Sequence, residues 1–554
     1  MAIRFMSNSD VLIDYASLKT LVVDDIPGMR SALKMTLANF GVTRTDVAST
    51  AQEAIMRVTN TAYDLILADY NLGEARDGQQ LLEELRHRGL ITLQTVYIMV
   101  TAESVYEKVV ATAELAPDDY MLKPFNGEVL RNRLDAILLK KMAFREVHQH
   151  FLHGDLESAV EGCDVLLKTK PRYLVDALRF KGELLNAMGH FNEAEQLYRQ
   201  IIEMRAVPWA RLGLARALHA QGREEEAEAI LLDALEVTPE MVAAYDLLAE
   251  VRVARHDTQG AQQALQQGTT ISGKTVRRQQ LLGELAYENG DLGTAQTAYQ
   301  AALEKGKHSI FVSHADYGNL CRVQVEQGNL TAAMDTLKKG KDVLQQSPEG
   351  QLVSAVVQGL VHSQSGQAEA AKRALDEAAK LRESGARGDG RLMLDLASTL
   401  ISHGRHEEAD TIVGEVAKNA HDSEALLNKA KQIYHNTGRA EIAEQLLKQA
   451  TTEVRQLNNE GVFLAQKGDF EAAIERLLRA AHEAPYNPRV LMNAAWVILR
   501  EIDEHGLNEA RLDEAKRLLE SVAKLAPGHT RLPGLHTHVR EIEARFGIKR
   551  KISS

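Results

Sequence analysis

Acidic, hydroxyl and basic side chains follow four short apolar runs near the start of the chain. Asp24 and Asp25 follow the first run, and Asp69 follows the second. Thr101 follows the third run and Lys123 follows the fourth. The runs occupy residues 21–23, 65–68, 96–100 and 120–122. If each run is a strand of one parallel sheet, these side chains meet in one crevice beyond the carboxyl edge of that sheet.

Three carboxylates in one crevice predict a cation between them. Clustered carboxylates repel one another unless a positive charge neutralises them, and hard oxygen ligands with open water positions suit Mg²⁺. A carboxylate beside Mg²⁺ can attack phosphorus and form an aspartyl phosphate. The metal, the Lys123 ammonium and the Thr101 hydroxyl would then stabilise the three phosphoryl oxygens. The residue types therefore favour phosphoryl transfer.

Amphipathic helical stretches alternate with these runs up to about residue 140. Each run is short and aliphatic or β-branched, and is followed by a turn and a helical pattern. Strands of this kind are buried on both faces of a parallel sheet. The alternation predicts a doubly wound α/β domain, which would place the crevice where such sheets bind ligands.

Four motifs in this segment resemble those of a response-regulator receiver domain of two-component signalling. They stand in the expected order: LVVDDIPGMR (21–30), DLILADYNL (64–72), MVTAES (99–104) and DYMLKPF (119–125). The resemblance implies a flavodoxin-like, five-stranded parallel sheet over residues 19–141, preceded by an N-terminal extension at 1–18. It also implies that the chain is not an enzyme beyond its own phosphorylation and dephosphorylation.

The resemblance assigns roles to individual residues. Asp69 is the phosphoacceptor. Asp25 and Asp69 bind Mg²⁺ directly, together with the backbone carbonyl of Asn71, and Asp24 assists through water. Lys123 binds the phosphoryl group, with Mg²⁺ as the cofactor.

Thr101 and Tyr120 are, by the same resemblance, the switch pair. The threonine binds the phosphoryl group and moves toward it, while the aromatic ring turns inward. Asn71 and Glu103 stand two residues after the phosphoacceptor and two after the switch threonine. They match the single-domain chemotaxis receivers, whose phosphates are short-lived, so the resemblance implies that these two residues tune dephosphorylation toward a brief signal.

Two local features accompany the motifs. The Lys123–Pro124 peptide bond is expected to be cis, as it usually is in receivers. The loop at 72–78 lacks the usual Met-Pro turn and is one residue longer, so its flexibility is expected to differ.

A glycine followed five residues later by an alanine recurs from about residue 142. With His256 in one glycine slot, successive steps are 35, 33, 34, 34, 38, 38, 38, 34 and 30 residues. The pairs are Gly154 with Ala159, Gly189 with Ala194, Gly222 with Ala227, His256 with Ala261, Gly290 with Ala295, Gly328 with Ala333, Gly366 with Ala371, Gly404 with Ala409, Gly438 with Ala443, and Gly468 with Ala473. This period resembles the tetratricopeptide repeat, a helix–turn–helix unit. The glycine would end the first helix in a left-handed conformation, and the alanine would allow two helices to cross closely.

The repeats predict an all-α superhelix over residues 142–530, with about ten or eleven repeats and a concave face for a partner protein or peptide. The 38-residue steps predict longer helices or loops, with 385–390 as the clearest loop. Residues 531–554 would form a capping helix and a basic tail, Lys549–Lys551. Cys163 and Cys321 are expected to be core residues.

Composition excludes several classes of function. The net charge of −12 disfavours DNA binding, which depends on Lys and Arg. Two cysteines in 554 residues exclude a disulfide scaffold and fit a reducing compartment. No run of about 18 apolar residues exists, so we expect no membrane insertion and a cytoplasmic location. His148, His150 and His153 lack the i, i+4 spacing of a helical metal pair.

These parts predict a bacterial response regulator whose output is protein–protein interaction. A cognate histidine kinase or phosphotransfer protein would phosphorylate Asp69, and the helix at about 126–141 would carry the change into the first repeat. A phosphorylation-dependent homodimer is a further expectation. The alternative is a phosphorelay intermediate or phosphate sink whose repeats only localise the receiver. A weaker alternative is a transcription or RNA-linked regulator acting through repeat contacts.

Overall fold

The structure is a computed structural model of the whole chain. It describes residues 13–73, 76–101, 117–204, 207–272, 275–307, 309, 311–526 and 531–548. The chain divides into two compact units, one formed by residues 1–285 with 301–312 and the other by residues 286–300 with 313–554.

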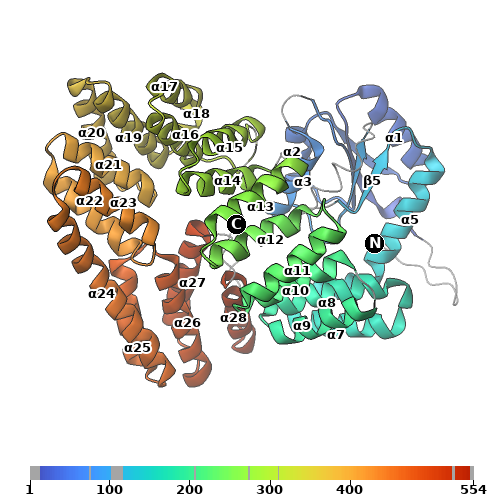
Figure 1. Cartoon of the computed structure of the whole chain (residues 1–554). Helices are drawn as coiled ribbons and strands as arrows, with labels where there is room; N and C mark the ends of the chain where they lie inside the picture. Colours follow the sequence, from blue (N-terminus) through green and yellow to red (C-terminus); the bar gives the residue numbers. More distant parts are fainter. Residues whose placement is uncertain are drawn as a thin grey trace. The chain divides into compact units, whose positions relative to one another are not determined.

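The first unit begins with a five-stranded sheet in the order β2-β1-β3-β4-β5, in which every pair of neighbours is parallel (Figure 1). The strands are β1 (Lys19–Val23), β2 (Arg44–Ala48), β3 (Leu65–Asp69), β4 (Val96–Thr101) and β5 (Asp119–Leu122). The helices described around it are α1 (Pro27–Asn39), α2 (Ala51–Asn60), α3 (Gly78–His87) and α5 (Gly127–Ala143), after a 3₁₀ turn at Tyr15–Ser17. This strand order is that of the flavodoxin-like doubly wound fold, as predicted.

Apolar side chains cover both faces of the sheet. Leu21 and Ile66 pack with residues of α2 and α3 on one face. Val22 and Leu67 pack with residues of α1 and α5 on the other face. Because successive strand residues point to opposite faces, a continuous apolar run is what a sheet with two covered faces requires.

Paired helices follow the sheet domain. The pairs are α6 (Arg145–His153) with α7 (Leu156–Thr169), α8 (Leu174–Met188) with α9 (Phe191–Met204), α10 (Pro208–Ala220) with α11 (Glu224–Val237), α12 (Val242–Ala254) with α13 (Thr258–Ile271), α14 (Val276–Glu288) with α15 (Leu292–Lys305), α16 (His314–Glu326) with α17 (Leu330–Lys339), α19 (Pro348–Gln364) with α20 (Ala368–Glu383), α21 (Gly390–Ser402) with α22 (His406–Asn419), α23 (Glu424–Asn436) with α24 (Ala440–Gln466), α24 again with α25 (Phe470–Glu483), and α26 (Pro488–His505) with α27 (Glu509–Leu525). A 3₁₀ turn at Pro171–Tyr173, the short α18 (Lys341–Leu344) and the last helix α28 (Leu532–Arg545) complete the described elements. The tail at 549–551 lies outside the described residues.

The glycines between paired helices have left-handed backbones. Their φ angles lie between 71° and 82°, and His256, which takes the same position in its repeat, has φ 61°. Gly189, Gly222, Gly290 and Gly468 are among them. Glycine adopts this conformation without the steric cost that a Cβ imposes.

The alanines five residues after these glycines lie in the second helix of each pair and are buried. Those that follow the four glycines just named have no exposed surface; they are Ala194 on α9, Ala227 on α11, Ala295 on α15 and Ala473 on α25. Helices cross closely beside them: a Cβ at Gly461 on α24 would lie 3.2 Å from the backbone oxygen of Ala473. A methyl side chain fits such a crossing, because a larger one would push the two helix axes apart.

Departures from the 34-residue period have structural causes. The 30-residue step, from Gly438 to Gly468, spans α24, a single helix of 27 residues that serves two neighbouring repeats without a turn between them. The predicted loop near 385–390 is present between the end of α20 at Glu383 and the start of α21 at Gly390. The step from Gly328 to Gly366 includes the extra helix α18.

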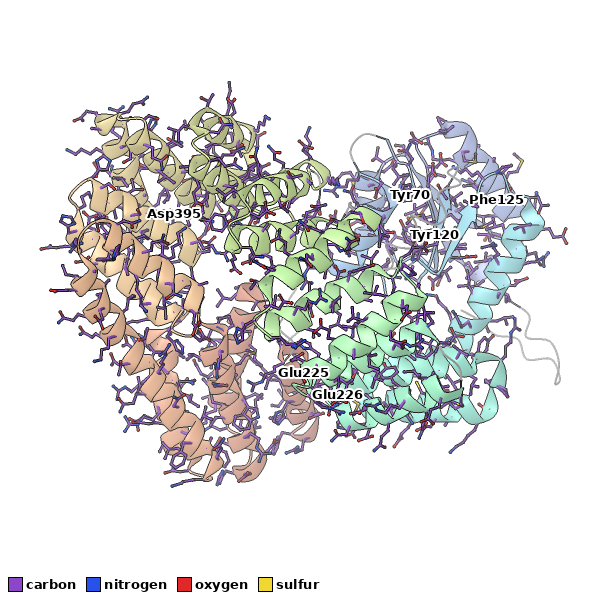
Figure 2. The ribbon with its side chains drawn as sticks, viewed as in Figure 1. Tyr70, Tyr120, Phe125, Glu225, Glu226 and Asp395 are labelled. Carbon is purple, nitrogen blue, oxygen red and sulfur yellow. The ribbon has the colours of Figure 1, made fainter. Side chains whose placement is uncertain are left out.

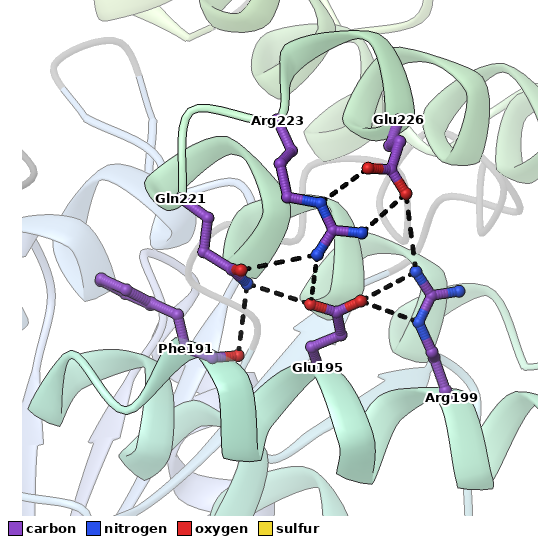
Figure 3. Close-up of polar contacts among 6 residues, drawn as sticks. All are labelled: Phe191, Glu195, Arg199, Gln221, Arg223 and Glu226. Atoms are coloured by element: carbon purple, nitrogen blue, oxygen red, sulfur yellow. Dashed lines mark hydrogen bonds and ion pairs between the residues drawn. The ribbon is translucent and has the colours of Figure 1, made fainter.

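Arginine side chains connect consecutive repeats in a recurring way. Arg223, the residue after a turn glycine, pairs with Glu195 on the second helix of the preceding repeat at 2.6 Å and with Glu226 at 2.6 Å (Figure 3). Arg405 pairs with Asp376 at 2.8 Å in the same arrangement. Such exposed pairs orient the repeats more than they stabilise them, because solvent screens their attraction.

A cluster of charged residues joins first helices of different repeats in the second unit. Asp395 on α21 (labelled in Figure 2) accepts a hydrogen bond from Nε of Arg322 at 2.5 Å and one from Nζ of Lys429 at 3.1 Å. Lys429 and Arg391 also lie 5.5 and 5.9 Å from the ring centre of Tyr287. This cluster, the Asp395 clasp, therefore connects the first helices of four repeats, α14, α16, α21 and α23.

The sheet domain joins the first repeat without a flexible linker. Phe144 is the only residue between α5 and α6, and it caps both helices. Nζ of the buried Lys141 donates to the backbone oxygens of Leu93 and Thr95 at 2.7 and 2.8 Å and pairs with Asp118 at 2.8 Å. Burial lowers the pKa of Lys141, and the carboxylate of Asp118 opposes that effect.

His148 lies at this junction. Gln94 Nε2 is 2.8 Å from Nδ1 of His148 and donates to it when the ring is neutral. The rings of Phe144 and Phe180 lie 5.7 and 5.4 Å away. Burial, followed by the positive charge of Lys141, lowers the pKa of His148 to about 4. Packing and the hydrogen bond with Gln94 therefore account for His148.

Stability of the junction is expected to fall between pH 6.5 and pH 4. In that window the unfolded chain binds a proton at His148 and the folded chain does not, so acid favours unfolding. Because the ring is partly exposed, we expect the free energy of unfolding to fall by about 2 kcal/mol, which is less than the full pKa shift of His148 would give. Urea unfolding, followed by Trp209 fluorescence in a Trp496→Phe background, should show this pH dependence, and His148→Gln should flatten it. If the free energy of unfolding of His148→Gln depends on pH as strongly as that of the unmodified chain, His148 is not the group responsible.

Candidate functional site

The carboxyl ends of four adjacent strands bring the predicted side chains together. Asp24 and Asp25 follow the last residue of β1, Asp69 is the last residue of β3, and Thr101 is the last residue of β4. Lys123 follows β5, and its backbone N–H donates to the carbonyl of Thr101 at 2.7 Å. Since these strands are parallel neighbours in register, their ends meet at one edge.

Three carboxylates form the acidic part of the site. One oxygen from each of Asp24, Asp25 and Asp69 lies within 4.8 Å of the other two. Asp24 and Asp69 are buried, whereas Asp25 is exposed to solvent. Carboxylate oxygens at this separation, with one side open to water, fit a hard divalent cation such as Mg²⁺.

Lys123 supplies a positive charge to the same cluster. Its Nζ lies 2.9 Å from Oδ2 of Asp24 and 3.2 Å from Oδ2 of Asp69. Burial raises the pKa of Asp69; Lys123 opposes this rise and the neighbouring charge of Asp24 adds to it. One ammonium therefore only partly neutralises the three carboxylates, so a further cation would stabilise the cluster.

The backbone around Asp69 is closely packed. Gly78, the first residue of α3, donates its N–H to the carbonyl of Tyr70 at 2.8 Å. A Cβ at Gly78 would lie 2.3 Å from the carbonyl oxygen of Asp69, so only glycine fits. Tyr97 donates its hydroxyl to the carbonyl of Gly78 at 2.9 Å. The N-terminus of α3 is thus packed directly against the predicted phosphoacceptor.

The predicted switch residues lie on β4 and β5. Thr101 is buried, and Tyr120 is half-buried against the apolar layer that α2 and α3 cover. Figure 2 places Tyr120 and Tyr70 in the same part of the sheet domain. Burial raises the pKa of Tyr120 to about 12, so its hydroxyl is protonated at neutral pH. Of the two tuning positions, Asn71 is exposed and Glu103 lies outside the described residues.

The cis Lys123–Pro124 bond is present, as predicted. Arg30 also contacts the site, although the motifs did not predict it. Its Nη1 donates to the backbone carbonyl of Asp24 at 2.5 Å. Arg30 ends the first motif, six residues after Asp24, but nothing in that spacing alone indicates a backbone contact.

The two cysteines take no part in this site. Cys163 and Cys321 are fully buried in α7 and α16, as predicted for core residues. Burial raises the pKa of each to about 12, so both remain protonated, unreactive thiols.

Comparison with known families identifies both parts of the chain. Residues 20–135 match the response regulator receiver domain, and residues 185–251 match the tetratricopeptide repeat. The chain therefore carries a response-regulator receiver domain at its N-terminal end, followed by tetratricopeptide repeats.

Two curated relatives match about a fifth of the chain each. The chain is 36% identical to the transcriptional regulatory protein CiaR of Streptococcus pneumoniae over 131 residues, which are 23% of this chain and 55% of CiaR, about half of that relative's length. It is 29% identical to the chemotaxis protein CheY-3 of Vibrio cholerae over 127 residues, 22% of this chain and 92% of CheY-3. The crystal structure of Vibrio cholerae CheY4 is 26% identical, with coverage of 22% and 98% and a TM-score of 0.21, which is too low to bear on the fold.

Helices that could cross a membrane were sought in the described part of the chain. None there combines the necessary length with sufficient apolar character.

Proposed function

We propose that the chain is a two-component or phosphorelay response regulator in which phosphorylation of Asp69 controls a protein-binding output of the repeats. The receiver would span residues 19–141, the repeats 142–530 and the capping segment 531–554. The observation that carries this proposal is the cluster of Asp24, Asp25 and Asp69 with Lys123 at the strand ends.

Asp69 receives the phosphoryl group from a phosphohistidine of a kinase or phosphotransfer protein. A carboxylate oxygen of Asp69 attacks phosphorus, the P–O bond forms, and the P–N bond breaks with its electron pair going to the histidine ring. Asp24, Asp25, Asp69 and the carbonyl of Asn71 would hold Mg²⁺, which supplies charge neutralisation to the transferring group.

The remaining residues of the site act on the phosphoryl oxygens. Nζ of Lys123 lies close enough to Asp69 to pair with a phosphoryl oxygen after transfer. Thr101 donates its hydroxyl to another oxygen, and this movement lets Tyr120 turn inward. Asn71 and Glu103 set the lifetime of the phosphate. The continuous α5–α6 connection supports transmission to the first repeat.

Labelling with a small phosphodonor tests the proposal. Incubation with phosphoramidate and Mg²⁺ should add one phosphoryl group to the chain, measured by intact mass, and excess EDTA should prevent it. A chain that takes up no phosphoryl group from phosphoramidate with Mg²⁺ present would contradict the proposed function. Recovery of the phosphoryl group on an added histidine phosphotransfer protein would instead favour a relay intermediate or phosphate sink.

A further inference from the structure

The second unit contains a hollow of about 600 Å³ that lies among four consecutive helices, α17, α18, α19 and α20. One stripe of α19, from Gln351 to His362, and one stripe of α20, from Ala370 to Leu381, form two of its walls. Residues spaced three and four apart share one helix face, so each wall is a continuous surface. Sites of this volume accommodate a small molecule or a short peptide segment.

A broken helix borders this hollow. The second helices α9, α11 and α25 each have 14 residues, whereas α17 has 10 and ends at Lys339. A Cβ at Gly340 would lie 2.4 Å from the ring of Tyr317, so the close packing of α16 requires a glycine at the break. The chain then forms the four-residue α18 instead of continuing α17. Lys341 and Leu344 of this short helix line the hollow.

The hollow and the Asp395 clasp share no residue. Helices α17, α18, α19 and α20 line the hollow, whereas the ion pairs of the clasp join α16, α21 and α23. The hollow is also separate from the cluster around Asp69.

Three cations that make no direct ion pair line the hollow. Lys338, Lys341 and Arg373 are exposed, and within the described ranges none of them has an ion pair or a side-chain hydrogen bond. Arg405 and Arg439, on neighbouring repeats, both pair with aspartates. In a chain with a net charge of −12, the three cations outnumber the one carboxylate in the lining, Glu377, so the hollow has a local excess of positive charge.

The floor of the hollow is apolar. Leu337, Leu344, Ala355 and Ala374 are buried side chains that line it. Glu377 is the one carboxylate among the lining residues. An occupant that fits these features carries negative charge at its ends or edges and an apolar group between them.

We propose that this hollow binds an acidic segment of a partner protein, with an apolar side chain against Leu337 and Leu344 and carboxylates paired with Lys338, Lys341 and Arg373. A single-stranded nucleic acid fits less well. Its bases stack on aromatic side chains, and neither Phe, Tyr nor Trp lines the hollow, while Glu377 repels phosphate.

Charge reversal at matched positions tests the proposal. The probe is a fluorescein-labelled peptide of alternating Glu-Glu-Leu units, and binding to the full chain is followed by anisotropy. Lys338→Glu with Arg373→Glu should weaken binding by at least about ten-fold, because like charges then face the peptide. The control, Lys339→Glu with Lys372→Glu, changes the net charge equally on neighbouring exposed residues that do not line the hollow, and should leave affinity within about two-fold.

A variant that fills the hollow tests the proposal independently of charge. Ala370→Trp places an indole in the hollow without changing charge and should also weaken binding, with circular dichroism confirming an unchanged helix content. Equal losses in the two charge-reversal variants, or no binding of the probe to the unmodified chain at millimolar concentration, would overturn the proposal. Tighter and equally variant-sensitive binding of an oligonucleotide of matched charge would overturn it in favour of nucleic acid.

Discussion

Asp69→Asn is expected to abolish phosphoryl labelling of the chain by phosphoramidate and Mg²⁺. The amide is not a nucleophile toward phosphorus, and it removes one of the three carboxylates that lie within 4.8 Å of one another. Lys123→Met should slow labelling by about a hundred-fold, because it removes one preorganised positive charge from the phosphoryl oxygens. Both effects are measured by intact mass over a time course.

Asp64→Asn is the matched control. Asp64 stands at the opposite, amino end of β3 and accepts a hydrogen bond from the backbone of Lys19 at 2.9 Å. Its replacement should leave labelling unchanged. Misfolding does not account for the effect of Asp69→Asn, because burial raises the pKa of Asp69 and the neutral amide removes a charge that the folded state disfavours. Labelling of Asp69→Asn at the rate of the unmodified chain would show that another residue is the phosphoacceptor.

Asp395→Ala is expected to lower the free energy of unfolding of the second unit by about 3–5 kcal/mol. Burial alone would raise the pKa of Asp395, but Arg322 and Lys429 outweigh it and hold the pKa below the ordinary value. Without the carboxylate, buried Arg322, only 3% exposed, loses its closest ion-pair partner and keeps the more distant Asp389 at 4.0 Å. Urea unfolding followed by Trp496 fluorescence in a Trp209→Phe background measures the loss.

Two further variants distinguish charge burial from simple truncation. Asp376→Ala breaks the more exposed pair with Arg405 and should cost less than about 1 kcal/mol. Arg322→Met combined with Asp395→Leu removes both charges and should recover most of the stability lost in Asp395→Ala, since an apolar pair has no desolvation cost. Equal losses of unfolding free energy in Asp395→Ala and Asp376→Ala would show that the buried clasp contributes no more to stability than the more exposed pair.

The clasp also restricts how a partner can bind the first helices that it connects. Tyr287, Arg322 and Lys429 already contact Asp395 or one another. A partner that binds these side chains has to displace their contacts or bind beside them. Lys338, Lys341 and Arg373 at the hollow make no such ion pair among the described residues, so they are available to an acidic segment.

Local sequence patterns determined most of the receiver and the repeat scaffold. Strands buried on both faces of a sheet appear in the sequence as continuous apolar runs. The residues after these runs reach the same edge of the sheet because parallel strands share one direction. The strand β2 has no continuous apolar run, because it lies at the edge of the sheet and only Ala48 in it is fully buried. The turn glycines were equally readable, since a left-handed backbone selects glycine at a regular period.

Only the tertiary structure decided which distant side chains meet. Arg322 and Asp395 are 73 residues apart, and neither position differs from an ordinary charged helix residue until the superhelix brings the two together. The break after α17 depends on the ring of Tyr317, which leaves Gly340 no room for a Cβ. Lys338 and Arg373 likewise read as solvated surface charges in the sequence. Local spacing therefore predicts the residues at the strand ends and the repeat period, whereas the clasp and the hollow depend on how successive repeats stack.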